Sequence, residues 1–430
     1  MTKPAVLDLD DEQMRFAPLG PDVYGRTQPQ TLLTTIEEDA EPLLDLVGQH
    51  VVSIQTFRPQ TLLQLFRLAA KYESNPGRYI THSVPLRGKI LINAFYEPST
   101  RTRLSFDSAW HRLGGTSINI TDRATTGIAK GESLEDVAHM FNNYGDCVVL
   151  RDGDAGAVYA MSQTLRIPII NAGNGIDEHP TQAMADLFTI LKWRPALAEQ
   201  QVAPEQRIRI GVIGVPARMR TVRSLLRILA KFPQMVEEVV VIHAPEANPE
   251  ESLFDPGQRE ELQEAGLKLR ISTDLLAELP DLDVTYINAI AWVGDSFEVH
   301  GDQFRLTKDL PYKPGSIVLH PLARGAELST CMDDTPHNWY FSQARGAVFL
   351  RMALLTCMGT GPNGSWMLFE TGLCVESVVS SMLTRNGRSI RSCWSTWRRS
   401  RSIEAPMDLV SKRSMMRVWG SAMHAFRSLI

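Results

Sequence analysis

Hydroxyl and guanidinium side chains are concentrated in the segment Ser99-Thr100-Arg101-Thr102-Arg103, between the apolar run 90–95 and a helical pattern at 104–113. A strand that turns into a helix directs the free N–H groups of the helix's first turn to one point, where the peptide dipoles also favour negative charge. Arginine and hydroxyl side chains supply further donors that suit phosphate oxygens. The segment predicts a phosphate site, although a helix cap followed by surface arginines explains these residues equally well.

His179 stands at the expected start of another helix, after the apolar run 167–171. At the carboxyl end of a parallel strand, where open sheets bind ligands, a neutral imidazole N–H could polarise a carbonyl oxygen. Gln182, one helical turn later, offers an amide oxygen to a substrate NH2 group. Considered alone, His179 is more typical of a helix-capping or core histidine.

Three further cations stand where an ordinary surface charge would also be expected. Arg151 closes the apolar strand 147–150, and Lys130 lies in the polar, glycine-containing segment 121–133, which is typical of a mobile loop. Arg220 begins the helix that follows the run 210–215, where it could neutralise the carboxylate of a substrate. None of the three identifies a site by itself.

Several motifs in a fixed order give these residues a common context: Glu97-Pro98-Ser99-Thr100-Arg101-Thr102-Arg103, Lys130-Gly131-Glu132-Ser133, His179-Pro180-Thr181-Gln182 and His320-Pro321-Leu322. Together they resemble the catalytic chain of the aspartate carbamoyltransferase family, within the aspartate/ornithine carbamoyltransferase superfamily. The similarity covers roughly residues 50 to 358 and is strong again at 335–341. The resemblance implies two parallel-sheet α/β domains with the active site in the cleft between them.

The resemblance also assigns roles. It implies transfer of the carbamoyl group of carbamoyl phosphate to an amine, by default that of aspartate, giving N-carbamoyl-aspartate for pyrimidine biosynthesis. It implies that the 121–133 loop reaches the neighbouring subunit's site, so the expected active unit is a homo-oligomer, a trimer. His179, Arg101 and Lys130 are the expected catalytic residues. The full expected carbamoyl-phosphate set is Ser99, Thr100, Arg101, Thr102, Arg151, His179, Gln182 and Leu322, and the expected acceptor set is Thr126, Lys130, Arg220 and Pro321.

The chain departs from the family where the acceptor's side chain would bind. The aspartate enzymes carry an arginine and a glutamine after the strand 283–287, but this chain has Ala289 and Ala291, and 288–300 contains no Arg or Lys. Charged hydrogen bonds are worth roughly 1.5 to 3 kcal/mol each, so aspartate should lose affinity. This predicts, as alternatives, an acceptor without a side-chain carboxylate or an inactive ligand-binding relative. In addition, Ala323 replaces a proline, which makes a cis peptide bond there less favourable.

Composition excludes several classes of protein. The 430 residues carry a net charge of −5, which gives no indication of nucleic-acid binding, and no run of about 18 apolar residues predicts a membrane span. The acidic N-terminus lacks the order of a secretory signal, so we expect a cytoplasmic protein. The five cysteines are scattered, without the spacing of a zinc or redox pair. We therefore expect free thiols, no metal and no cofactor.

Apolar runs and helical patterns alternate along the chain, which predicts parallel sheets covered on both faces. Expected strands lie at 90–95, 148–150, 167–170, 210–215, 239–242, 267–271, 284–287 and 316–319. The expected organisation is an acidic extension (1–50), a carbamoyl-phosphate domain (51–200), an acceptor domain (201–340), a helix returning to the first domain (341–358) and a basic, disordered tail (359–430). Gly211 and Gly214 only weakly suggest a dinucleotide fingerprint, because the third glycine is missing.

Overall fold

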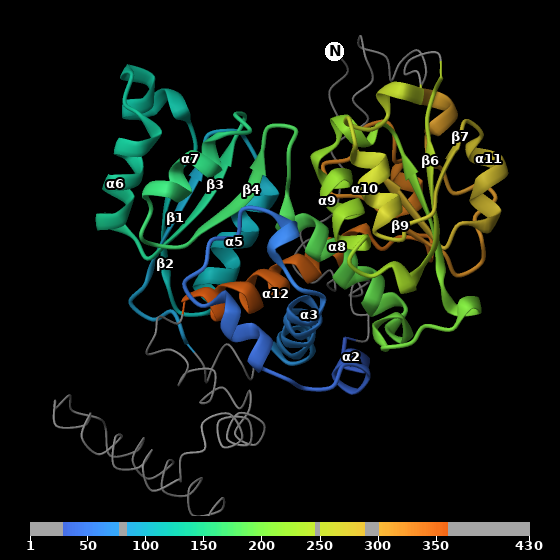
Figure 1. Ribbon diagram of the computed structural model, residues 1–430, viewed down its shortest axis with the longest axis horizontal. Helices are drawn as coiled ribbons and strands as arrows, with labels where there is room; N and C mark the ends of the chain where they lie inside the picture. Colours follow the sequence, from blue (N-terminus) through green and yellow to red (C-terminus); the bar gives the residue numbers. More distant parts are fainter. Residues whose placement is uncertain (1–28, 77–83, 246–249, 289–300, 360–430) are drawn as a thin grey trace, which may run out of the picture. The chain divides into compact units, whose positions relative to one another are not determined.

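The computed structural model describes residues 29–76, 84–245, 250–288 and 301–359. A four-stranded parallel sheet is built from β1 (Ile90–Phe95), β2 (Thr116–Ile120), β3 (Cys147–Asp152) and β4 (Ile169–Asn174), in the order β2-β1-β3-β4 (Figure 1). Its crossover helices are α5 (Thr100–Arg112), α6 (Leu134–Tyr144) and α7 (Ala157–Thr164). Successive side chains of a strand point to opposite faces. Ile92 and Ala94 therefore pack with α6 and α7, whereas Leu91 and Phe95 join the core that contains α5.

A second parallel sheet is formed by β5 (Ile208–Ile213), β6 (Val236–Ile242), β7 (Leu269–Ser272), β8 (Val284–Ile287) and β9 (Ile317–Leu319), in the order β7-β6-β5-β8-β9. Its helices are α9 (Arg220–Leu229), α10 (Gln258–Glu264) and α11 (Leu275–Glu278). The strands read as continuous apolar runs because both faces are covered. The prediction of two parallel-sheet α/β domains is confirmed.

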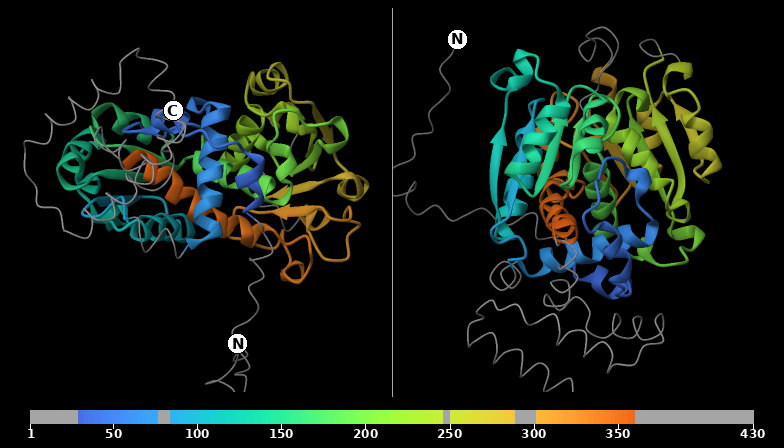
Figure 2. Two further views of the ribbon diagram at one scale, coloured as in Figure 1. Left: turned by 90° about the horizontal axis from the view of Figure 1, so that it is seen from below. Right: turned by 60° about the vertical axis from the view of Figure 1, so that its left-hand side comes forward.

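The last described helix packs against three other helices and carries residues that reach the site. Helix α12 (Tyr340–Gly359) contacts α3 (Pro59–Ser74), α5 and α8 (Pro180–Trp193), and Figure 2 shows it crossing α3. Helix α8 also contacts α9 of the second sheet. Every residue of α8 from Pro180 to Lys192 is buried, so its polar side chains must find partners inside the protein.

All of the strands expected from the sequence are present, within a few residues of the expected bounds. Strand β2 was not predicted, because its residues are exposed or half-buried at the sheet edge and therefore lack an apolar run. Of the expected extension, residues 29–50 contain α2 (Thr31–Thr35) and a 3-10 helix (Glu41–Leu46) with buried leucines. Residues 1–28, the tail from 360 onward and the segment 289–300 lie outside the described residues. None of the described helices has the length and hydropathy needed to cross a membrane.

Candidate active site

The predicted phosphate site lies where β1 leads into α5. Ser99 precedes the first helical residue, Thr100, and its hydroxyl makes no capping bond to the helix. The first-turn N–H groups of α5 and the Ser99 hydroxyl are therefore left for another acceptor. Arg101 and Thr102, in the same turn, line a cavity.

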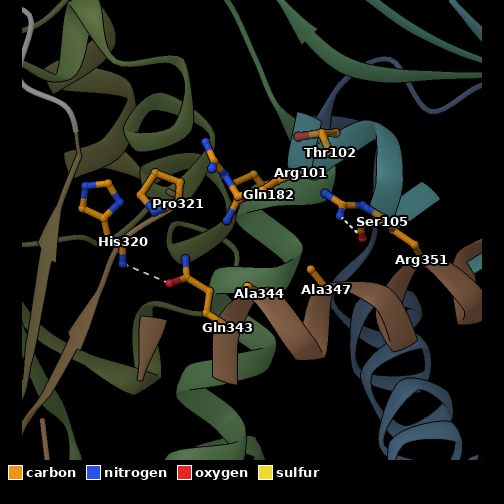
Figure 3. A pocket seen from close by; sticks show the side chains of 10 residues that line it. All are labelled: Arg101, Thr102, Ser105, Gln182, His320, Pro321, Gln343, Ala344, Ala347 and Arg351. Atoms are coloured by element: carbon orange, nitrogen blue, oxygen red, sulfur yellow. Dashed lines mark hydrogen bonds between the residues drawn. The ribbon is translucent and has the colours of Figure 1, made fainter. Parts of the chain in front are cut away.

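That cavity is formed by segments distant in sequence (Figure 3). Helix α5 contributes one wall, α8 contributes Gln182, the segment after β9 contributes His320 and Pro321, and α12 contributes the remaining wall. Residues of both sheet domains therefore face the same small space. The lining residues are Arg101, Thr102, Ser105, Gln182, His320, Pro321, Gln343, Ala344, Ala347 and Arg351.

A single carboxylate joins the two predicted anion-binding arginines. Glu97 Oε1 accepts from Arg151 Nη2 at 2.5 Å and from Arg220 Nη2 at 2.6 Å, and its Oε2 accepts from Arg220 Nη1 at 2.9 Å. Burial acts to raise the pKa of Glu97, but the hydrogen bonds and charges of both arginines lower it overall. Burial lowers the pKa of Arg151 to about 10. The positions expected to hold the phosphate and the acceptor's carboxylate are thus neighbours.

His179 is 3% exposed and occupies the residue before α8. Its backbone N–H donates to Ser224 Oγ at 2.9 Å, which fixes the start of the helix. Its Nδ1 is buried and has no hydrogen-bond partner among the described residues. Burial, followed by the charges of Arg151, Arg351 and Arg220, lowers the pKa of His179 well below its usual value. The imidazole is therefore neutral near pH 7, as polarisation by an uncharged N–H requires.

Gln182 is held from within its own helix. Its Nε2 donates to Asp186 Oδ1 at 2.7 Å, and Gln343 Nε2 donates to the same oxygen at 2.5 Å. The Tyr286 hydroxyl donates to Asp186 Oδ2 at 3.0 Å. Burial raises the pKa of Asp186 to about 7, against the opposing effect of these hydrogen bonds.

The segment that follows β9 is also held by hydrogen bonds. The His320 N–H donates to Gln343 Oε1 at 3.0 Å, and the Leu322 N–H donates to His320 Nδ1 at 2.8 Å. His320 Nε2 lies 2.9 Å from Glu327 Oε1. The peptide bond from Leu322 to Ala323 is cis, although Ala323 stands in place of the family's proline.

Of the expected site residues, Arg101, Thr102, Gln182 and Pro321 line the cavity, whereas Ser99, Thr100, Arg151, His179, Arg220 and Leu322 lie outside its lining. Thr126 and Lys130 lie in or beside a 3-10 turn (Gly127–Lys130), Lys130 is exposed, and neither lines the cavity of its own chain. The expected mobile loop contains a second 3-10 turn, at Arg123–Thr125. Arg123 Nη1 is 3.1 Å from Asp152 Oδ1, which connects this loop to the end of β3.

Four residues of this region were given no role from the sequence: Glu97, Asp186, Gln343 and Arg351. Glu97 belongs to the motif around Ser99, so its position there was the one available signal. Arg351 is 3% exposed, donates to Ser105 Oγ, and its guanidinium carbon lies 4.7 Å from the centroid of the Phe106 ring. Burial lowers the pKa of Arg351 to about 10. The single acidic residue of a helix whose residues are mostly apolar is the signal that could have identified Asp186.

Comparison with known proteins identifies the domains. Residues 49–192 match the model of the aspartate/ornithine carbamoyltransferase carbamoyl-P binding domain, and residues 206–358 match that of the Asp/Orn binding domain. The chain belongs to the aspartate/ornithine carbamoyltransferase family. It is a carbamoyltransferase of the aspartate carbamoyltransferase type. The resemblance read from the motifs is therefore confirmed.

Relatives are similar over nearly their whole length. The aspartate carbamoyltransferase catalytic subunit of Alkaliphilus oremlandii is 34% identical over 73% of this chain and 92% of its own. Aspartate carbamoyltransferase 1, chloroplastic, of Pisum sativum is 32% identical over 79% of this chain and 87% of its own. The crystal structure of aspartate transcarbamoylase from Trypanosoma cruzi with carbamoyl aspartate and phosphate has a TM-score of 0.62 at 30% identity, covering 74% of this chain and 98% of that one.

Proposed function

We propose that this carbamoyltransferase uses carbamoyl phosphate and aspartate, giving N-carbamoyl-aspartate and phosphate for pyrimidine biosynthesis. The observation that carries the proposal is the cavity in which the first turn of α5, Gln182 and the segment 320–321 converge beside the arginine pair held by Glu97. Relatives 30 to 35% identical are named for aspartate, and T. cruzi structures hold carbamoyl phosphate with aspartate.

The phosphate dianion is assigned to the start of α5. Ser99, Thr100, Arg101 and Thr102 provide hydroxyl, guanidinium and backbone donors at one point, and Arg151 reaches the same region from β3. Charge-assisted hydrogen bonds to phosphate are roughly twice as strong as hydrogen bonds between neutral groups. This site positions the carbamoyl group against α8.

The chemistry needs no enzymatic nucleophile. The uncharged acceptor amine attacks the carbonyl carbon, the new C–N bond forms, and the C–O bond to phosphate breaks as phosphate leaves with the proton released by the amine. The neutral His179 N–H stabilises the negative charge that develops on the carbonyl oxygen, and Gln182 accepts a hydrogen bond from the carbamoyl NH2. Rate enhancement then comes from positioning and preorganised donors.

Arg101→Ala tests the phosphate site. Titration calorimetry with carbamoyl phosphate and with inorganic phosphate should show a loss of affinity of about tenfold or more, the scale of one charged hydrogen bond. Arg103→Ala, one residue outside the cavity lining, is the matched control and should bind both ligands as the wild type does. Equal affinities in Arg101→Ala and the wild type contradict the assignment.

The α-carboxylate of the acceptor is assigned to Arg220. One sequence observation favours a second candidate: residues 288–300 contain no Arg or Lys, and alanines stand at 289 and 291. An acceptor with one carboxylate and a neutral side chain would leave no buried charge unpaired there.

The two acceptor classes are separated by kcat/KM. Phosphate release is measured with aspartate and with neutral and basic amino acids and small amines, in the wild type and in Ala289→Arg. The proposal requires aspartate to be the best acceptor of the wild type. A neutral acceptor that exceeds aspartate, with the order reversed in Ala289→Arg, supports the second candidate, and no turnover with any amine supports a ligand-binding relative.

We also propose that the active unit is a homotrimer with shared sites. Thr126 and Lys130 do not line the cavity of their own chain. Leu104 of α5 and Ile118 of the edge strand β2 are 52% and 47% exposed, and these two elements contact each other. Exposed apolar side chains on adjoining elements are candidates for contact with a second copy of the chain.

Complementation tests the shared site. Chains carrying Lys130→Ala and chains carrying Arg101→Ala are mixed after reversible dissociation, and some hybrid oligomers should regain a site with both residues intact. Analytical ultracentrifugation establishes that each parent is a trimer. Trimeric, inactive parents that yield no activity on mixing contradict shared sites.

A cytoplasmic location is the remaining part of the proposal. The described cysteines Cys147, Cys331 and Cys357 are free thiols, two of them buried, as is usual in a reducing compartment. The chloroplastic relative from Pisum sativum defines the main alternative. Imaging of the full chain with a C-terminal fluorescent fusion distinguishes the two locations.

A further inference from the structure

Asp186 is a fully buried carboxyl group one helical turn beyond Gln182 on α8. It receives hydrogen bonds from three elements: Gln182 of α8, Gln343 of α12 and Tyr286 of β8. Both glutamine amides donate to Oδ1, and the tyrosine hydroxyl donates to Oδ2. All three donors converge on this one carboxylate.

These contacts fix the orientation of the Gln182 amide. An ionised carboxylate only accepts hydrogen bonds, so the Gln182 NH2 must face Asp186. The amide is planar, and its oxygen is then the end available to the cavity that Gln182 lines. Without Asp186, the amide could rotate and present its NH2 to the cavity instead.

Asp186 orients Gln343 by the same rule. The Gln343 NH2 faces Asp186, and its oxygen accepts the His320 N–H at 3.0 Å. Gln343 thereby fixes the backbone at the start of the segment His320-Pro321, which also lines the cavity (Figure 3). One carboxylate therefore controls two walls of the cavity.

We propose that Asp186 is a positioning residue that makes the site selective for carbamoyl phosphate over acyl phosphates with a methyl group in place of the NH2. This inference rests on the proposed carbamoyl transfer. Carbamoyl and acetyl phosphate have nearly the same shape, so the two NH2 hydrogens are the feature a site can read. Hydrogen-bond acceptors that face these hydrogens bind the NH2 group of carbamoyl phosphate. The same acceptors stay unpaired when the methyl group of acetyl phosphate takes its place.

The test compares binding of carbamoyl phosphate, acetyl phosphate and inorganic phosphate by calorimetry, above neutral pH, in the full-length wild type, Asp186→Leu and Asp186→Asn. Asp186→Leu removes the acceptor and keeps the same branched arrangement of heavy atoms. Its preference for carbamoyl over acetyl phosphate should fall about tenfold, the scale of one hydrogen bond, while affinity for inorganic phosphate stays within about threefold. Asp186→Asn keeps an oxygen for both glutamines and should retain the preference.

A double-mutant cycle separates positioning from general stabilisation. Gln182→Leu alone should lose the preference for carbamoyl over acetyl phosphate. Adding Asp186→Leu to Gln182→Leu should then lower this preference less than Asp186→Leu lowers it in the wild type. Additive losses, an unchanged preference in Asp186→Leu, or parallel loss of inorganic phosphate binding overturn the inference. If Asp186→Leu does not fold, Gln343→Leu decides, because it should also lower the preference.

Failure of the proposed function is recognised separately. A wild type that binds carbamoyl and acetyl phosphate equally well contradicts carbamoyl recognition itself and, with it, this inference. A wild type that prefers carbamoyl phosphate, combined with an Asp186→Leu variant of equal preference, contradicts only the role of Asp186.

Discussion

Replacing His179 by alanine is expected to lower kcat by about 10²-fold, with a much smaller change in KM for carbamoyl phosphate. The Nδ1 of His179 is buried without a partner among the described residues, and burial holds its pKa well below the ordinary value. The group is thus a neutral donor near pH 7. Removing one uncharged donor to a developing oxyanion costs roughly 2.7 to 4 kcal/mol, and the expected loss in kcat corresponds to the lower end of that range.

The assay measures phosphate release at saturating carbamoyl phosphate and acceptor across a pH series. His179→Asn keeps a neutral N–H donor and should recover part of the lost rate. Because the folded protein holds this imidazole neutral, its protonation should produce no inflection in the wild-type kcat near pH 6.5. An inflection present in the wild type and absent from His179→Asn would show that His179 titrates there. Such an inflection, or an alanine variant within about threefold of the wild-type kcat, refutes the reasoning.

Stability gives an independent check of the same pKa. An unfolded histidine gains a proton below about pH 6.5, whereas the buried one does not, so unfolding takes up a proton. The wild-type free energy of unfolding should therefore fall relative to that of His179→Asn as the pH drops, by about 1.4 kcal/mol per pH unit. Urea denaturation at several pH values measures the slope, and parallel curves contradict the lowered pKa.

Three further predictions concern buried charges. Lys192→Met should destabilise the fold by about 3 to 5 kcal/mol in urea denaturation, because it leaves the buried Glu73 carboxylate without its closest partner. That carboxylate is 2% exposed and lies 3.0 Å from the Lys192 Nζ. Adding Glu73→Gln should restore part of the lost stability, and a Lys192→Met variant as stable as the wild type contradicts the prediction. Because the pKa of Asp186 is raised to about 7, the folded state keeps a proton that the unfolded state releases near pH 4. The wild-type free energy of unfolding should therefore fall relative to that of Asp186→Asn as the pH rises from about 4 to about 7, by about 1.4 kcal/mol per pH unit. Denaturation curves with the same pH dependence in both proteins contradict this. Arg351→Met should weaken inorganic phosphate binding about tenfold in calorimetry, since it removes a positive charge from the cavity wall, and undiminished binding would show that this charge does not reach the ligand.

The sequence determined most of the fold. Each expected strand is a run of apolar residues, because a parallel sheet covered on both faces excludes water from every side chain of its central strands. The edge strand β2 was missed for the corresponding reason, since its residues are exposed or half-buried and its composition is mixed. The grouping of Ser99, Arg101 and Thr102 was also predictable, because the chain itself places them in one helical turn.

Only the tertiary structure decided which residues support that site. Glu97 meets Arg220 across 123 positions of sequence, and Asp186 meets Tyr286 and Gln343 across 100 and 157. No sequence periodicity predicts such contacts, because each depends on how helices and strands of different domains pack. A buried polar group must find its partner wherever the fold provides one, so the sequence shows that Asp186 needs partners and the packing of α8, α12 and β8 decides which they are.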